Sequence, residues 1–181
     1  MDAVCALHRR GALFCGANPG IMRMTADEDG ERVMISTGGI GQVQDLLASL
    51  SDKALRGGEL ADNELPYVAP EVLTGRPIEV PSDIFTIGVL AFEMVTGIQP
   101  FSGRSLPELL GHMMGGRPRH PSDVNPEVPS GAAACILRCL EREPASRFDT
   151  AAAVRRAWRG LEPPPQVDPD SGGLAGERVG S

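Results

Sequence analysis

The apolar and polar positions of this chain follow a helical period through most of residues 83–161. Residues 83–96 are apolar on almost every side, a pattern that predicts a helix buried at the centre of the fold. Ser82 or Asp83 is expected to cap its first turn, and Gly97 to end it. Three amphipathic helices are expected to follow, because apolar residues then recur three or four positions apart. The positions expected to be buried in them are Leu106, Leu109, Leu110 and Met113, then Ala133, Ile136, Leu137 and Leu140, and finally Ala151, Val154, Trp158 and Leu161.

The starts of these three helices carry N-terminal signals. Ser105-Leu-Pro-Glu108 has the spacing of a capping box, with proline in the first turn, where its missing N–H costs nothing. Ser130 is expected to cap the second helix, and Asp149-Thr150 precedes the third. The pattern therefore predicts a helix-rich second half.

The first part of the chain predicts a different mix of elements. Residues 3–10 have the pattern of the last turns of a helix, and Gly11 is a natural stop. Residues 21–25 and 32–36 are typical of two short strands, and the Asp29-Gly30 pair between them favours a hairpin turn. Residues 38–66 are rich in glycine and predict a loop with a weakly helical piece inside it.

A chain of 181 residues has room for one domain with a proper core. We expect that domain to cover residues 1–161. After Leu161 the sequence turns to proline, glycine, aspartate and serine, so residues 162–181 are expected to be a disordered tail.

The charge balance argues against two classes of partner. The net charge is −7 and the isoelectric point is near 5.0, whereas nucleic-acid and anionic-membrane surfaces usually require a basic face. The longest apolar run lies within residues 84–95, which is too short to span a bilayer, and Glu93 interrupts it. No charged start followed by an apolar run marks a signal peptide, so we expect a cytoplasmic protein. In that compartment the four cysteines, Cys5, Cys15, Cys135 and Cys139, are interpreted as reduced, buried small residues in preference to a metal or disulfide site, because no pair has CxxC spacing. Cys135 and Cys139 are four residues apart and share one helix face.

Four short motifs carry a resemblance to a known family. They are Ala69-Pro-Glu71, Ser82-Asp-Ile-Phe-Thr-Ile-Gly88, Thr96-Gly-Ile-Gln-Pro-Phe-Ser-Gly103 and Glu143-Pro-Ala-Ser-Arg147. In order and spacing they resemble the large lobe of bacterial serine/threonine protein kinases, over roughly residues 3–161. The resemblance implies a mainly α fold: a kinase large-lobe helical bundle with one small β-hairpin near the N-terminus, and no small lobe.

The resemblance also implies three architectural residues. Glu71 is expected to form a buried ion pair with Arg147, whose planar guanidinium suits a two-pronged contact with a carboxylate. Asp83 is expected to accept hydrogen bonds from the backbone of the loop that holds the catalytic aspartate in the family. All three are interpreted as residues that hold the fold.

The residues that perform phosphoryl transfer in this family do not occur here. That reaction needs a carboxylate to orient the acceptor hydroxyl, and an aspartate and an asparagine to hold Mg²⁺. By resemblance, Gly16 stands at the position of the base, Asn18 at that of the lysine and Ile21 at that of the metal-binding asparagine. Ser36 stands at the position of the metal-binding aspartate, where a neutral hydroxyl is a poor Mg²⁺ ligand. We therefore expect no catalytic residue, no metal site and no bound cofactor.

These absences favour a truncated pseudokinase that acts as a binding or regulatory module. The alternative is a serine/threonine kinase whose small lobe lies on another chain or upstream, and only that alternative predicts ATP and Mg²⁺ as cofactors. A third reading is a decaying gene fragment without function. For the pseudokinase, the predicted docking surface for another protein is the face where the small lobe would sit. The residues expected there are apolar and rich in methionine, which adapts to varied partners: Phe14, Ile21, Met22, Met24 and Met34.

Overall fold

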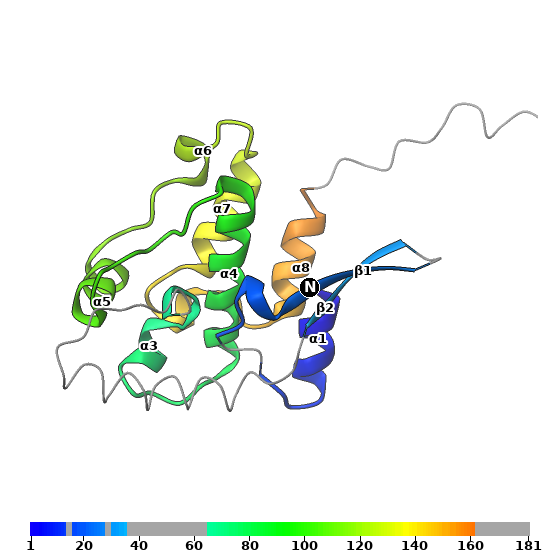
Figure 1. The fold of residues 1–181 in the computed structure, drawn as a ribbon, viewed down its shortest axis with the longest axis horizontal. Helices are drawn as coiled ribbons and strands as arrows, with labels where there is room; N and C mark the ends of the chain where they lie inside the picture. Colours follow the sequence, from blue (N-terminus) through cyan, green and yellow to red (C-terminus); the bar gives the residue numbers. More distant parts are fainter. Residues whose placement is uncertain (14–15, 28–29, 36–64, 162–181) are drawn as a thin grey trace, which may run out of the picture.

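A computed structural model describes residues 1–13, 16–27, 30–35 and 65–161, with residues 21–27 and 30–35 described for their backbone only. This part of the chain is mainly helical, with one antiparallel hairpin (Figure 1). The α-helices are α1 (Asp2–Arg9), α3 (Pro70–Leu73), α4 (Val80–Thr96), α5 (Leu106–Gly115), α6 (Pro121–Val124), α7 (Ser130–Cys139) and α8 (Ala151–Arg159). Three single 3-10 turns accompany them, at Pro19–Ile21, Leu65–Tyr67 and Pro144–Ser146. The predicted mainly α fold with a hairpin near the N-terminus is confirmed.

Helix α4 is the centre of the fold, as its apolar sequence predicts, but it begins earlier than expected. Its N-cap is Glu79, whose side chain accepts from the backbone of Ser82, while the Ser82 hydroxyl lies 3.4 Å from the Glu79 N–H. The predicted cap at Ser82 or Asp83 is therefore wrong, because both residues already lie inside the first turn. The predicted end is right, since Gly97 takes the left-handed conformation (φ 74°) that favours glycine.

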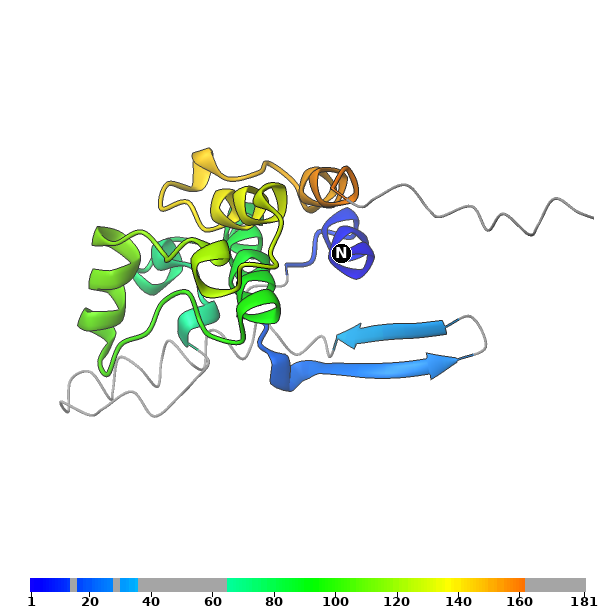
Figure 2. The same ribbon diagram turned by 90° about the horizontal axis from the view of Figure 1, so that it is seen from above.

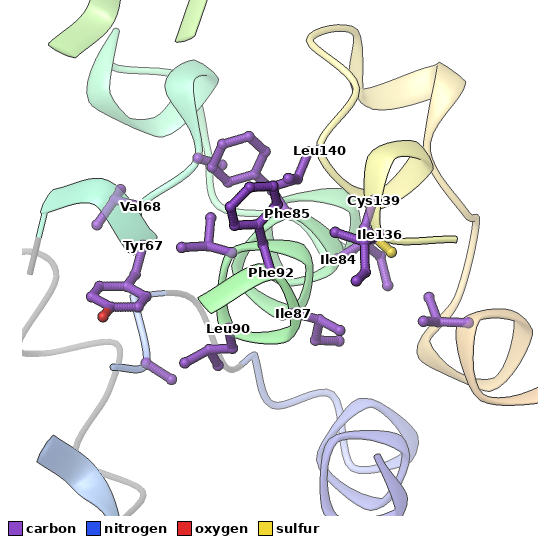
Figure 3. Close-up of a cluster of buried hydrophobic side chains, with 14 of the residues drawn as sticks. Tyr67, Val68, Ile84, Phe85, Ile87, Leu90, Phe92, Ile136, Cys139 and Leu140 are labelled. Atoms are coloured by element: carbon purple, nitrogen blue, oxygen red, sulfur yellow. The ribbon is translucent and has the colours of Figure 1, made fainter. Parts of the chain in front are cut away.

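The core forms where α4 packs against α7, α8 and the turn at residues 65–67. Figure 3 shows α4 surrounded by apolar side chains, among them Phe85, Phe92, Ile136 and Leu140. The α4 and α7 backbones approach closely at Gly88, where an added Cβ would lie 2.7 Å from the Cβ of Cys139. Burying this apolar surface supplies the main favourable free energy of folding.

One residue of α4 departs from the pattern. Met94 is 84% exposed, although the helix around it is apolar and mostly buried. The prediction that α4 is buried on every side therefore fails near its C-terminal end.

The later helices begin close to their predicted positions. Ser105 caps α5 by accepting from the N–H of Glu108, and Thr150 caps α8 by accepting from the N–H of Ala153. Ser130 does not cap α7, because it is the first helical residue and Pro129 takes the N-cap position. Most residues that were predicted to be buried in these helices are buried or half-buried, but Leu161 is exposed beyond the end of α8.

The N-terminal elements also match their predictions. Helix α1 ends at Arg9, and Gly11 follows it in the left-handed region (φ 70°). Strands β1 (Met22–Asp27) and β2 (Gly30–Ile35) pair from Met22 with Ile35 to Asp27 with Gly30. Figure 2 shows this hairpin extending to one side of the helices. Asp29 of the predicted turn, the loop at 38–64 and the tail at 162–181 lie outside the described residues.

Within the described ranges, no helix is long and apolar enough to cross a membrane. The three cysteines described there, Cys5, Cys135 and Cys139, are free thiols and buried, as expected. Cys15 lies outside the described residues.

Candidate functional site

The ion pair between Glu71 and Arg147 joins the Ala-Pro-Glu segment to the segment between α7 and α8. Arg147 Nη1 donates to Glu71 Oε1 at 2.7 Å and Arg147 Nη2 donates to Glu71 Oε2 at 2.9 Å. The Ser82 hydroxyl donates to Glu71 Oε1 at 3.0 Å, so α3 and α4 share the contact. Both partners of the ion pair are buried, and the guanidinium carbon lies 5.0 Å from the ring centre of Phe85. The carboxylate and guanidinium therefore meet in the two-pronged geometry that the resemblance implies.

Arg147 also donates to three backbone carbonyls. They reach the carbonyl oxygens of Pro81 (2.8 Å), Glu141 (2.8 Å) and Arg142 (3.2 Å). Burial disfavours ionisation of Glu71, but the hydrogen bond and charge of Arg147 outweigh it, so the pKa of Glu71 is lowered. One side chain thus ties together the starts of α3 and α4 and the segment after α7.

Asp83 connects the central helix to the N-terminal helix. His8 Nε2 donates to Asp83 Oδ2 at 2.7 Å, and the Asp83 side chain is fully buried. The sequence analysis did not predict this partner of Asp83, because the two residues are 75 positions apart and His8 belongs to none of the four motifs. The expected contact between Asp83 and the loop backbone stays a prediction, since residues 14 and 15 of that loop are outside the described part.

Gly16 lies against the same helix one turn further along. Its φ is 75°, and its N–H donates to the Thr86 hydroxyl at 3.4 Å. Thr86 in turn donates to the Tyr67 carbonyl at 2.9 Å. The N–H of Gly16 is thus held by a side chain of α4, and glycine has no side chain of its own.

The other positions of this loop are only partly described. Asn18 Oδ1 accepts from the N–H of Gly20 at 2.8 Å, so the amide supports its own turn. Ile21 ends the 3-10 turn Pro19–Ile21. Ser36 lies outside the described residues. Among the residues that are described, no group of three or more His, Cys, Asp or Glu side chains could hold a metal ion.

The predicted docking surface is also described only in part. In the hairpin register Met34 pairs with Arg23, the residue between Met22 and Met24 on β1. Phe14 lies outside the described residues, and only the backbone of Ile21 is described. Because paired residues share a face of a hairpin, Met34 is on the face of Arg23 and on the other face from Met22 and Met24. The predicted surface as a whole stays a prediction.

The sequence analysis missed a group of hydrogen-bonded polar side chains, Tyr67, Glu93 and Gln99. The Tyr67 hydroxyl donates to Glu93 Oε2 at 2.5 Å and accepts from Gln99 Nε2 at 3.3 Å. Burial and the neighbouring Glu93 carboxylate raise the pKa of Tyr67 to about 12. Glu93 interrupts an otherwise apolar helix, and that interruption is the one sequence signal that could have suggested a polar partner.

Comparison with known proteins defines the class. The family model described as "Protein kinase domain" matches residues 59–159, more than half of the chain. The chain belongs to the protein kinase family.

The similar proteins include several bacterial serine/threonine kinases. The chain is 32% identical over 148 residues to the serine/threonine-protein kinase PkaA of Streptomyces coelicolor, which covers 81% of this chain and 25% of that protein. It is 29% identical over 158 residues to the serine/threonine-protein kinase Pkn1 of Myxococcus xanthus, covering 86% of this chain and 22% of that protein. The chain therefore matches about a quarter or less of the length of these relatives.

Proposed function

We propose that this chain is a non-catalytic, kinase-like domain that acts by binding another protein. The observation that supports the proposal is Gly16, whose N–H contacts the Thr86 hydroxyl of α4. By the resemblance, Gly16 stands at the position of the family's catalytic base. Phosphoryl transfer needs a carboxylate there to orient the acceptor hydroxyl. A glycine offers no group that could accept or orient a proton.

The neighbouring positions support the same proposal. The side chain of Ile21 has no atom that could bind Mg²⁺, and Asn18 has no positive charge to stabilise a phosphate. Positioning and electrostatic stabilisation supply most of the rate of phosphoryl transfer, because the protein does little covalent chemistry in this reaction. Losing these groups together is expected to leave no useful catalysis. In this proposal Glu71, Asp83 and Arg147 keep the architecture and the binding surface lies beside the hairpin, around Phe14, Ile21, Met22, Met24 and Met34.

The alternative is an active serine/threonine kinase that is completed by a small lobe from elsewhere, and family membership favours it. Nucleotide binding separates the two. We expect millimolar ATP with Mg²⁺ to leave the melting temperature of the chain unchanged, with Mg²⁺ alone as the control. A ligand at a hundred times its Kd would add about 2.7 kcal/mol to the free energy of unfolding, which a melting curve detects readily. A clear ATP-dependent rise would contradict the non-catalytic proposal.

A direct assay of phosphoryl transfer complements the binding test. We expect no transfer from labelled ATP to generic acceptor proteins. The control is the Arg147→Ala variant, which is expected to unfold the domain. Transfer that is lost in this variant comes from the chain itself, whereas transfer that persists comes from a contaminant. Such transfer would establish the enzyme alternative.

A further inference from the structure

The two helices at one end of the molecule form an unusually basic surface. Helices α1 and α8 pack together, far from α5 in Figure 2. With the α1 C-cap they carry five arginines and a single aspartate, a net charge of +4 in a chain whose total is −7. The arginines are Arg9, Arg10, Arg155, Arg156 and Arg159, and all are exposed or half-buried.

A carboxylate already lies between two of these arginines. Asp2 forms an ion pair with Arg155, and its second oxygen is 3.8 Å from Arg159 Nη2. The pKa of Asp2 is lowered, mainly by its hydrogen bond with Arg155. Arg155 and Arg159 are four residues apart and therefore share one face of α8. The geometry shows that this face holds a carboxylate group.

The remaining arginines extend the same surface. Asp2 and Arg9 are seven positions apart, two turns of helix, so Arg9 lies on the side of α1 that faces α8. Arg156 follows Arg155 on the exposed side of α8. Within the described residues, Arg9, Arg10 and Arg156 form no ion pair. Three guanidinium groups thus stand free beside a pair that already binds a carboxylate.

We propose that this α1–α8 surface is a docking site for an acidic peptide segment of a partner protein. Side-chain carboxylates of such a segment would take up the two-pronged hydrogen bonds that arginine offers. A short peptide fits the local positive charge, whereas an extended polyanion such as a nucleic acid would also meet the negative remainder of the chain. The site shares no residue with the surface proposed around Phe14, Ile21, Met22, Met24 and Met34, and it does not depend on the absence of catalysis.

The test measures binding of a fluorescein-labelled peptide of alternating glutamate and serine to the full chain by fluorescence anisotropy. The matched control peptide has glutamine in place of glutamate. We expect binding of the glutamate peptide only, weakening as salt is raised. Arg156→Gln with Arg159→Gln should weaken it about tenfold. Arg117→Gln with Arg119→Gln, an exposed arginine pair on the loop after α5, removes the same charge and should leave binding unchanged.

Asp2→Asn provides a second, opposite readout. It removes the carboxylate that competes for Arg155 and Arg159, so it should strengthen peptide binding by a few-fold. Unchanged or weaker binding in a folded Asp2→Asn variant, or equal losses in the two arginine pairs, would overturn the proposal. So would a single-stranded oligonucleotide that binds as strongly as the peptide. If binding appears only after Asp168→Asn with Asp170→Asn, the chain's own tail occupies the surface, and the assignment to a partner is wrong.

Discussion

Arg147 holds the carboxylate of Glu71 with both of its terminal nitrogens, at 2.7 and 2.9 Å, across 76 residues of sequence. The contact joins the Ala-Pro-Glu segment to the segment that follows α7. Because Arg147 also reaches three backbone carbonyls, it fixes the relative position of several elements at once.

Arg147→Ala should therefore be strongly destabilising. We expect a loss of about 3–5 kcal/mol in the free energy of unfolding, because Glu71 would remain a buried charge without its partner. Urea denaturation followed by circular dichroism measures the change. Arg142→Ala, which removes an exposed arginine five residues earlier, should change stability by less than about 0.5 kcal/mol. A comparably small loss in Arg147→Ala would mean that the ion pair contributes nothing.

The same pair predicts a pH dependence. The folded-state pKa of Glu71 is lowered, so its contribution to stability is fully present above the unfolded pKa of about 4.3 and is lost as pH falls through the folded value. The stability difference between wild type and Glu71→Gln should be largest near neutral pH and should shrink in acid. Denaturation curves recorded from pH 7 downward test this. A difference that stays constant in acid would contradict the lowered pKa.

The close approach of α4 and α7 at Gly88 can be tested against a glycine with free space. Gly88→Ala would place a methyl group 2.7 Å from Cys139 Cβ and 3.0 Å from Leu140 Cδ2, so we expect a loss of about 1–3 kcal/mol. Gly111→Ala in α5 meets no heavy atom within 4 Å. That change should be neutral or stabilise the domain by up to about 1 kcal/mol, because alanine favours helix more than glycine. Melting curves of the two variants give the comparison, and equal effects would contradict the close packing.

The contact between His8 and Asp83 should anchor α1. His8→Ala removes a hydrogen bond to a fully buried carboxylate, so we expect a loss of about 1–3 kcal/mol and faster amide hydrogen exchange in α1. Arg9→Ala, at the exposed neighbouring position, serves as the control. If exchange in α1 is no faster in His8→Ala than in this control, α1 is held by its apolar contacts alone.

Tyr67 offers a spectroscopic test, because it is the only tyrosine in the chain. Its pKa is raised to about 12, whereas an unperturbed tyrosine ionises near pH 10. At a pH between these values the folded chain should show little tyrosinate absorbance. Glu93→Gln removes the neighbouring negative charge and should lower the pKa. An ionisation midpoint near 10 in the folded wild type would show that the hydroxyl is not held by Glu93.

The sequence alone determined the elements and the family. A local periodicity of apolar residues is visible directly in the sequence. It predicted α4, the amphipathic helices α5, α7 and α8, and the strand pair. The four motifs at their spacing indicated a kinase large lobe and the pair Glu71 and Arg147. The residue types at Gly16 and Ile21 were equally plain from the sequence.

The tertiary structure decided the contacts between distant residues that no motif implied. His8 with Asp83, Tyr67 with Glu93, and Asp2 with Arg155 join separate elements, and no local period encodes such a contact. The N-cap of α4 is Glu79, and cap geometry decided this position. The apolar pattern had pointed to Ser82 or Asp83. The exposure of Met94 likewise depends on which elements pack around α4, because a side chain is buried by its neighbours in space and the sequence of one helix does not list them.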